Sequence, residues 1–136
     1  MKTKVKLIDG VAFEGVSGSG HSITMDGALE GGGKNQGPRP MEMLLMGLGG
    51  CSAYDVVTIL RKSRQKISDL TLDIDAKRAE NDPKIFISIN LKFTIMGENV
   101  SEKLVKRAID LSAEKYCSAS IMLGKSATIT HEYKIL

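Results

Sequence analysis

Residues 37–60 read GPRPMEMLLMGLGGCSAYDVVTIL, and this stretch predicts the central element of the fold. Pro40 stands where the first residue of a helix tolerates proline, and apolar residues then recur at helical spacing from Met41 to about Arg64. The first half of this helix is apolar on all sides, so we expect it to be central and buried.

Three glycines, Gly47, Gly49 and Gly50, interrupt the predicted helix just before its cysteine. Each of them costs about 1 kcal/mol of helix propensity relative to alanine. This penalty is understandable if another backbone approaches the helix closely at this point. We therefore expect another backbone to lie close to the helix here, and this backbone can belong to a second subunit.

Alternating apolar and polar residues predict a small antiparallel meander before the helix. The alternation runs from Lys4 to Val16 with a hairpin turn at Asp9-Gly10, and residues 21–25 offer a third strand. Residues 27–39 carry five glycines and no apolar period, so they form a loop that is either a plain linker or a lid.

A second group of elements follows the helix. Strict alternation predicts strands over residues 70–76 and 85–95, with a turn at residues 81–83, and a last strand over residues 127–135. Between them, residues 104–112 present an apolar helical face that leads to Tyr116-Cys117. The order of elements predicts one α+β domain over residues 1–136, with antiparallel sheets.

The composition is that of a chain able to bury a core, since 42% of its residues are hydrophobic and 26% are charged. Its 19 basic and 16 acidic residues give a net charge of +3, which argues against nucleic-acid or polybasic membrane binding. The longest uncharged stretch, Met43 to Tyr54, is far shorter than the roughly 20 residues that span a bilayer. The N-terminus has no secretory h-region, so we expect a cytoplasmic protein.

The two cysteines, Cys51 and Cys117, are 66 positions apart. They are too few for a secreted disulfide framework or a four-ligand zinc site, and we expect no metal and no cofactor. Cys51 lies on the same stripe of the central helix as Leu44 and Leu48, while Cys117 follows the second helix. The cysteines are therefore either small buried hydrophobes or a redox-active pair.

Residues 37–60, together with Cys117 in the segment KYCSAS, resemble the OsmC/Ohr family of osmotically inducible and organic hydroperoxide resistance proteins, particularly its YhfA-like branch. The resemblance covers essentially the whole chain. It implies an OsmC-like fold, with two small antiparallel sheets around a central buried helix. It also implies an intertwined homodimer in which two central helices pack together and two active sites lie near the interface.

The resemblance implies thiol-dependent reduction of organic hydroperoxides. Cys51 would then attack the peroxide and become a sulfenic acid, and Cys117 would condense with it to a disulfide. An external dithiol reductant of lipoyl or thioredoxin type would restore both thiols. In the family, an N-terminal arginine holds the thiolate and a glutamate near the helix start orients that arginine.

These two supporting positions differ in this chain. Met41 stands at the usual glutamate position, and Glu42, one residue later, lies roughly 180° around an unbroken helix from Cys51. Glu42 is either part of the site or a favourable charge in the first helical turn. No arginine precedes Arg39, so Arg39 is the nearest substitute for the family's arginine, or else a solvated loop residue.

The segment Ser52-Ala53-Tyr54-Asp55 allows two interpretations. It matches a capping box, so a break at the glycines would start a new helix at Ser52, with Cys51 at its positive end. If the helix is continuous, Asp55 lies one turn from Cys51 and its charge disfavours a thiolate there. We expect continuity, because the apolar spacing carries through the glycines.

Two functional hypotheses follow. The first is a cytoplasmic dithiol peroxidase that acts on organic hydroperoxides in oxidative stress defence. The second is a noncatalytic dimeric module that binds a small apolar ligand in a pocket lined by Met41, Met43 and Met46.

Overall fold

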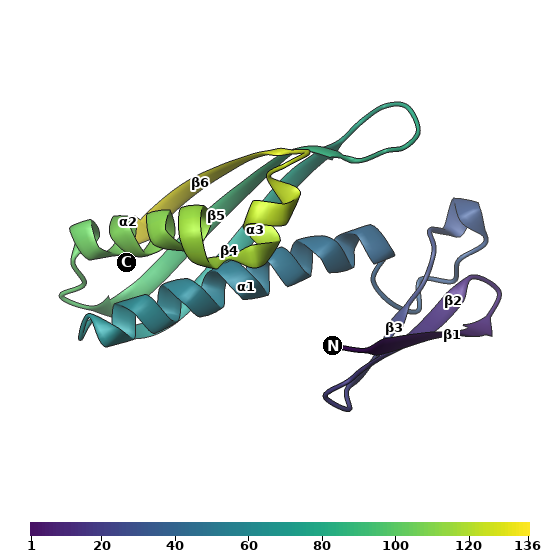
Figure 1. The fold of residues 1–136 in the computed structure, drawn as a ribbon, viewed down its shortest axis with the longest axis horizontal. Helices are drawn as coiled ribbons and strands as arrows, with labels where there is room; N and C mark the ends of the chain where they lie inside the picture. Colours follow the sequence, from purple (N-terminus) through teal and green to yellow (C-terminus); the bar gives the residue numbers. More distant parts are fainter. The chain divides into compact units, whose positions relative to one another are not determined.

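The structure is a computed structural model that describes residues 1–136. The chain divides into two compact units, residues 1–46 and residues 47–136. Figure 1 shows the elements, which follow one another as β1 (Thr3–Asp9), β2 (Ala12–Ser17), β3 (Ser22–Met25), the 3-10 turn η1 (Leu29–Gly31), α1 (Pro40–Lys62), β4 (Lys66–Arg78), β5 (Phe86–Glu98), α2 (Glu102–Leu111), the π-helical turn η2 (Ser112–Tyr116), α3 (Ser118–Leu123) and β6 (Thr128–Ile135).

The first unit contains the expected meander. Its three strands pair antiparallel in the order β1-β2-β3, with Leu7 opposite Phe13 and Phe13 opposite Met25. Gly10 has a φ of +53°, a conformation that glycine adopts without steric cost, and it turns the chain from β1 into β2. The hairpin predicted at Asp9-Gly10 is therefore confirmed.

The glycine-rich loop that follows β3 is anchored by one carboxylate. Asp26 is buried, and its side chain accepts hydrogen bonds from the backbone N–H groups of Gly27, Lys34 and Gln36 at 2.7, 2.9 and 3.2 Å. These bonds, that of Lys34 above all, lower the pKa of the Asp26 carboxyl below its usual range. Since the loop folds back onto Asp26, it is more than a plain linker.

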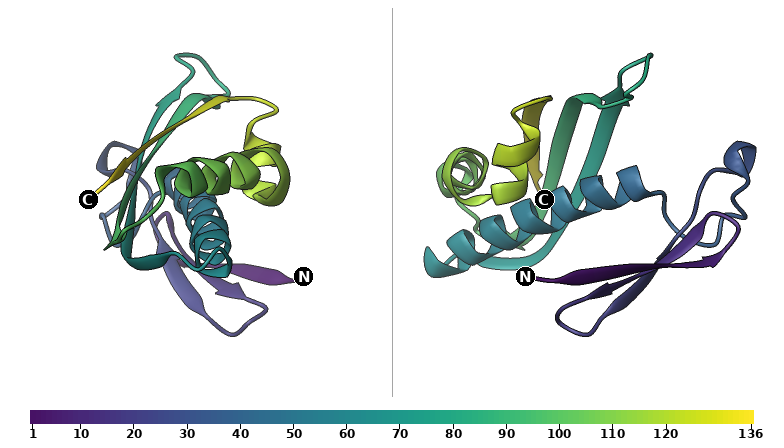
Figure 2. Two further views of the ribbon diagram at one scale, coloured as in Figure 1. Left: turned by 90° about the vertical axis from the view of Figure 1, so that its left-hand side faces the viewer. Right: turned by 45° about the vertical axis from the view of Figure 1, so that its right-hand side comes forward.

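The second unit has two layers. Its sheet has the strand order β4-β5-β6, and Figure 2 shows the helices of this unit gathered on one face of that sheet. Strand β4 pairs antiparallel with β5, as predicted, but β6 runs parallel to β5. The expectation of a purely antiparallel sheet is thus wrong here. The reason is that α2, η2 and α3 form a crossover connection, which returns the chain to the sheet in the same direction.

The core of this unit lies between the sheet and the helices. Alternate residues of β5 from Ile89 to Ile95 are buried, as the sequence pattern predicts, while the residues between them are less buried or exposed. The pattern is wrong at its start, where Ile85 and Ile87 are exposed and Phe86 is buried. Three elements supply most of the buried apolar side chains, namely Leu48, Val56 and Leu60 of α1, Ile89, Leu91, Phe93 and Ile95 of β5, and Val105, Ala108 and Ile109 of α2.

Helix α1 continues through Gly49 and Gly50 without a break. A methyl group on Gly49 would lie 2.8 Å from Cδ1 of Ile74, so this glycine makes room for a side chain of the sheet. Within the chain, therefore, the close neighbour is a side chain, where we expected a backbone. Gly47 and Gly50 have open space around them, and the approach of a second subunit there stays a prediction.

By length and composition alone, α1 is apolar enough to cross a membrane, a test that the core helices of soluble proteins also pass. Five of its residues, Leu48, Gly49, Ser52, Val56 and Leu60, are buried in the protein. Residues 40–47 are exposed or only partly buried within one chain, where burial was expected. In this fold α1 is the core helix on which the second sheet packs.

The C-terminal end of α1 is closed by Arg64, whose φ is +58°. The N–H of Arg64 donates to the carbonyl of Arg61, and the N–H of Gln65 donates to the carbonyl of Leu60, both at 2.9 Å. This pair of bonds is a Schellman motif, in which the left-handed position is usually glycine.

We predict that Arg64→Gly raises the free energy of unfolding by about 0.5–1 kcal/mol, because the side chain no longer has to adopt a left-handed conformation. Lys62→Gly is the matched control, since it also removes a positive charge but sits inside the helix, and it should cost about 1 kcal/mol. Urea unfolding followed by circular dichroism measures both, and a destabilising Arg64→Gly would contradict the assignment.

Candidate functional site

Helix α1 and the turn η2 bring the two cysteines together. The Sγ atoms of Cys51 and Cys117 and a carboxylate oxygen of Asp55 all lie within 4.8 Å of one another. Cys51 is half-buried and Cys117 is fully buried, and neither forms a disulfide. We call these three residues the dithiol cluster.

The π-helical turn positions Cys117. Its backbone N–H donates to the carbonyl of Ser112, five residues earlier, at 2.8 Å. Cys117 then takes an extended conformation, and its Sγ accepts a hydrogen bond from the N–H of Ser120 at 3.3 Å, where α3 begins. Such turns are frequent at functional sites, because they change the direction of side chains within a helix.

Two side-chain contacts tie this turn to α1. The hydroxyl of Ser112 donates to Oδ2 of Asp55 at 3.0 Å, and Oγ of Ser52 lies 3.4 Å from Sγ of Cys117. Both serines are buried, with only 2% of each exposed. A buried hydroxyl without a partner is costly, so these contacts also hold the two elements in register.

Burial raises the pKa of the Cys117 thiol above its usual value, and the neighbouring Cys51 thiol adds to this shift. The Ser52 hydroxyl and the Ser120 N–H act in the opposite direction, because both can stabilise a thiolate. Cys117 is consequently a protonated thiol at neutral pH.

Arg39 and Glu42 lie together at the start of α1. The backbone N–H of Arg39 donates to Oε2 of Glu42 at 2.9 Å, the contact by which an acidic residue in a first helical turn caps the helix. The Arg39 guanidinium donates to Oδ1 of Asn35 at 2.7 Å and to the carbonyl of Gly37 at 3.3 Å. These contacts are local, and a role for either residue in activating a thiol stays a prediction.

Two residues of the site, Ser52 and Ser112, were not identified in their present roles from the sequence. Because α1 is continuous, Ser52 is no helix cap, and the interpretation with a new helix starting there is wrong. Ser52 instead contacts Cys117, and Ser112 holds the carboxylate of Asp55. One signal was present in the sequence, since Ser112 is a polar residue on the otherwise apolar face of residues 104–112.

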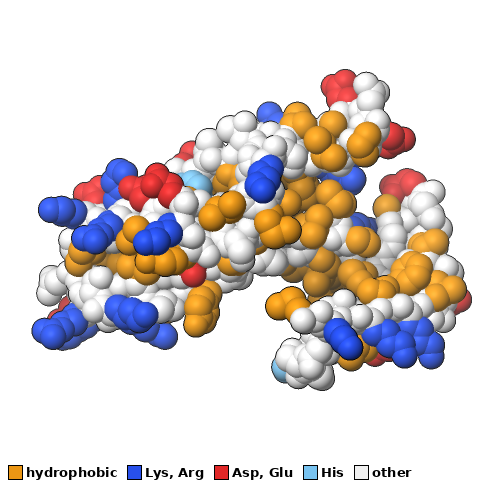
Figure 3. Space-filling view, viewed as in Figure 1, with side chains coloured by type: hydrophobic (Ala, Val, Ile, Leu, Met, Phe, Trp, Pro, Cys, Tyr) orange, Lys and Arg blue, Asp and Glu red, His pale blue; other side chains and the backbone are white.

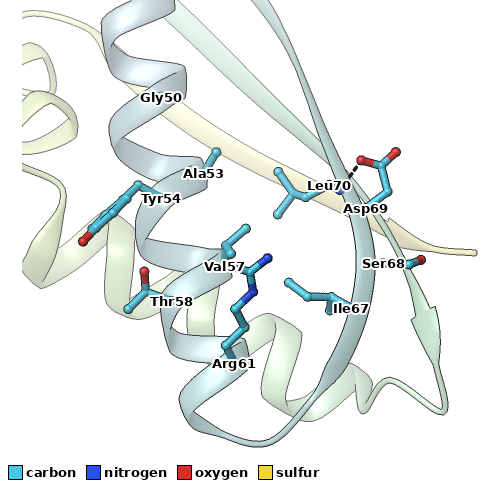
Figure 4. A pocket seen from close by; sticks show the side chains of 10 residues that line it. All are labelled: Gly50, Ala53, Tyr54, Val57, Thr58, Arg61, Ile67, Ser68, Asp69 and Leu70. Atoms are coloured by element: carbon cyan, nitrogen blue, oxygen red, sulfur yellow. Dashed lines mark hydrogen bonds between the residues drawn. The ribbon is translucent and has the colours of Figure 1, made fainter.

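Two hollows border α1 in this unit. The first has a volume of about 490 Å³, and Figure 4 shows its apolar walls on α1 and β4, with the Arg61 side chain reaching between them. The second, of about 500 Å³, has Asp55 in its wall, beside Tyr54, Tyr116 and Leu111. The second hollow therefore reaches the carboxylate of the dithiol cluster.

Two features define the class of this protein. It has an α+β fold with a crossover to a parallel last strand, and a thiol pair lies between its central helix and that crossover. The family model described as OsmC-like protein matches residues 32–132. The chain belongs to the OsmC-like family, and the recognition made from residues 37–60 and Cys117 is confirmed.

The chain is 46% identical over 136 residues to protein YhfA of Escherichia coli K12, an alignment that covers 100% of this chain and 98% of YhfA. Among solved structures, a hypothetical protein from Aquifex aeolicus VF5 is 35% identical with a TM-score of 0.84, and 99% and 96% of the two chains align. The organic hydroperoxide resistance protein OhrB of Bacillus subtilis is 17% identical, has a TM-score of 0.64, aligns over 98% of each chain and shares the fold.

We predict that a maleimide at pH 7 modifies one thiol of the reduced protein rapidly, and that this thiol is Cys51. Cys117 should react at least about tenfold more slowly, because burial lowers its thiolate fraction and adds an opening step. Since burial raises the pKa of the Cys117 thiol, the rate of its reaction should still be rising with pH above about 8.5, the usual pKa of a cysteine. Mass spectrometry of timed samples measures both rates.

The Cys51→Ser variant should lose the rapid reaction and Cys117→Ser should keep it. The opposite pattern would reverse the assignment of the accessible thiol.

Proposed function

We propose that this protein is a thiol-dependent peroxidase that reduces organic hydroperoxides in oxidative stress defence. The observation that carries the proposal is the approach of Cys51 and Cys117 to within 4.8 Å in an OsmC-like chain. Solved neighbours named as organic hydroperoxide resistance proteins, from Bacillus subtilis and Legionella pneumophila, support it through their shared fold.

The proposed reaction has two steps within the protein. The Cys51 thiolate attacks one oxygen of the O–O bond, the alcohol leaves with a proton, and Cys51 becomes a sulfenic acid. The Cys117 thiol then attacks that sulfur, forming a disulfide and releasing water. An external dithiol reduces the disulfide by exchange, so that one hydroperoxide and one dithiol yield alcohol, water and an external disulfide.

The environments of the two thiols support this division of roles. Cys51 is the less buried of the pair, as a group that meets a substrate must be. Cys117 is enclosed and stays protonated, because burial raises its pKa. Its sulfur lies beside the Ser52 hydroxyl and the Ser120 N–H, which stabilise the thiolate that forms as it attacks Cys51.

Arg39 is the proposed cation for the Cys51 thiolate of a second subunit, with Glu42 as the residue that positions it, because the unbroken helix α1 puts Glu42 roughly 180° around from Cys51 of its own chain. The Glu42 carboxylate accepts a hydrogen bond from the Arg39 backbone N–H, which fixes the backbone of Arg39 at the start of α1. A reducing cytoplasm would keep both cysteines as thiols between turnovers.

The first hollow, a groove between α1 and β4, supports the second candidate function, the binding of a small apolar ligand. Its walls include Ala53, Val57, Ile67 and Leu70, and Arg61 is a cation within it. Its volume of about 490 Å³ lies in the range of small-molecule sites, and its apolar walls favour an apolar ligand. The methionines expected to form a pocket, Met41, Met43 and Met46, do not line this groove.

We predict that the reduced protein turns over cumene hydroperoxide with dihydrolipoamide as electron donor. Cys51→Ser should abolish turnover, because no sulfenic acid can form at that position. Cys117→Ser should consume about one equivalent of peroxide and stop at a sulfenic acid that dimedone traps. Ser118→Ala, next to Cys117 but exposed, is the control and should keep full activity.

The peroxidase proposal would be contradicted if the unaltered protein showed no turnover and formed no Cys51–Cys117 disulfide after peroxide treatment. Ligand binding would then be the remaining function.

We also propose a homodimer. Apolar side chains are exposed in both units of the chain (Figure 3). Every residue of β1 is exposed, and on α1 Leu44 and Met46 leave 47% and 51% of their surface uncovered. Monomeric proteins rarely leave so much apolar surface in water, so a second copy that packs on α1 accounts for it.

We predict that the protein sediments as a dimer at micromolar concentration, and that Leu44→Glu combined with Met46→Glu shifts it to monomer. Buried carboxylates at a subunit interface have no partner, which disfavours association. Met122→Glu, at an exposed apolar position on α3, is the control and should stay dimeric. A monomeric unaltered protein in analytical ultracentrifugation would contradict the proposal.

A further inference from the structure

The dithiol cluster presents two sulfur atoms and a carboxylate oxygen to one point in space. The three ligand atoms lie within 4.8 Å of one another. In a tetrahedral zinc site, with Zn–S bonds of about 2.3 Å, two sulfur ligands are about 3.8 Å apart. Small side-chain adjustments therefore suffice for the three atoms to share one ion.

We propose that the reduced pair Cys51 and Cys117, together with Asp55, binds a thiophilic divalent cation, of which Zn²⁺ is the representative. Two sulfur ligands select such an ion over Mg²⁺ and Ca²⁺, which prefer oxygen. Three protein ligands leave the fourth tetrahedral position to water. The site uses the thiols of the proposed peroxidase in their reduced state and requires no hydroperoxide.

The residues around the cluster are arranged as metal ligands require. The Ser112 hydroxyl holds Oδ2 of Asp55 at 3.0 Å, which orients the carboxylate and leaves its other oxygen free for an ion. The Ser120 N–H and the Ser52 hydroxyl lie 3.3 and 3.4 Å from the Cys117 sulfur, where they stabilise a thiolate ligand. Both Ser52 and Ser112 are buried, so water does not compete with these contacts.

The exchange of protons for the ion is balanced in charge. Two neutral thiols and one carboxylate carry a charge of about −1, and Zn²⁺ with two thiolates and one carboxylate carries the same charge. Binding forms two Zn–S bonds and one Zn–O bond, and both thiol protons leave to solvent, with no change in oxidation state. Net charge is thus not added to a site in which Cys117 is fully buried.

A hollow in the surface borders the cluster at Asp55. Asp55 is half-buried and forms part of the wall of a hollow of about 500 Å³, which Tyr54, Lys62 and Tyr116 also line. An ion that enters this hollow comes next to Asp55, whose carboxylate oxygen lies within 4.8 Å of both sulfur atoms. Since a disulfide has no thiolate to offer, oxidation of the pair releases the ion, and a bound ion in turn blocks attack on peroxide.

Titration of the reduced, full-length protein with Co²⁺ under anaerobic conditions tests the site. We expect one Co²⁺ per chain, a thiolate-to-cobalt charge-transfer band in the near ultraviolet, the visible bands of a tetrahedral ion, and the loss of both when Zn²⁺ is added. Cys51→Ser and Cys117→Ser should each lose the charge-transfer band or halve it. Asp55→Asn should weaken binding at least about tenfold, and Ser112→Ala about 10–100-fold.

Asp69→Asn is the matched control for Asp55→Asn. Asp69 is exposed and its side chain contacts only the backbone N–H of Leu70, so this variant should bind Co²⁺ as the unaltered protein does. Circular dichroism of each variant separates loss of binding from loss of fold. Absence of the charge-transfer band in the unaltered protein, or binding that survives both Cys117→Ser and Asp55→Asn, would overturn the inference.

The peroxidase assay, run with a chelator present, keeps the two proposals distinguishable. Turnover without Co²⁺ binding would contradict the metal-site proposal alone. Co²⁺ binding without turnover would contradict the peroxidase proposal alone. If both hold, turnover in an assay without the chelator should be inhibited at the free Zn²⁺ concentration at which Zn²⁺ displaces Co²⁺.

Discussion

The contact between α1 and the π-helical turn η2 determines the distance between the two thiols. Ser112 and Cys117 are five residues apart, and in a regular α-helix, at about 100° per residue, their side chains would diverge by about 140°. The hydrogen bond from the Cys117 N–H to the Ser112 carbonyl widens the turn and brings the two side chains nearer to alignment. Both then reach α1, where Ser112 meets Asp55 and Cys117 meets Ser52.

Helix α1 presents one buried face, because four of its buried residues recur at every fourth position. Leu48, Ser52, Val56 and Leu60 form one stripe on the helix, and Ser52 is its only polar member. A serine in an apolar stripe requires a hydrogen-bond partner, and the Cys117 sulfur provides it. The same contact that satisfies the core therefore places Cys117 beside the neighbouring Cys51. Gly49, the residue after Leu48, lets the Ile74 side chain approach and places the helix on the sheet.

Much of the fold follows from local pattern. The alternation of residues 89–95 predicted the buried face of β5, and the spacing after Pro40 predicted α1 to within two residues of its end. The direction of β6 did not follow, because alternation is the same in parallel and antiparallel strands and only the path of the crossover decides between them. Proximity of the two cysteines was inferred from the family resemblance, and the structure brings them together. The roles of Ser52 and Ser112 depend on a π-helical turn, which residue spacing alone does not reveal.

The carboxylate of Asp55 has opposite effects on the two proposed activities, since its charge disfavours a free thiolate and favours a bound cation. With both thiols protonated, Asp55 is the one negative charge of the cluster, and a thiolate at either sulfur adds a second within 4.8 Å. The hydroxyls of Ser52 and Ser112 offer dipoles to this charge but no positive group. A peroxidase cycle must therefore bring a cation to the thiolate, and Arg39 is the residue proposed to do so. A divalent metal ion meets the same electrostatic requirement directly, since it neutralises both thiolates and takes Asp55 as its third ligand. The feature that makes the dithiol hard to activate without a cation is thus the feature that makes the cluster complete as a metal site.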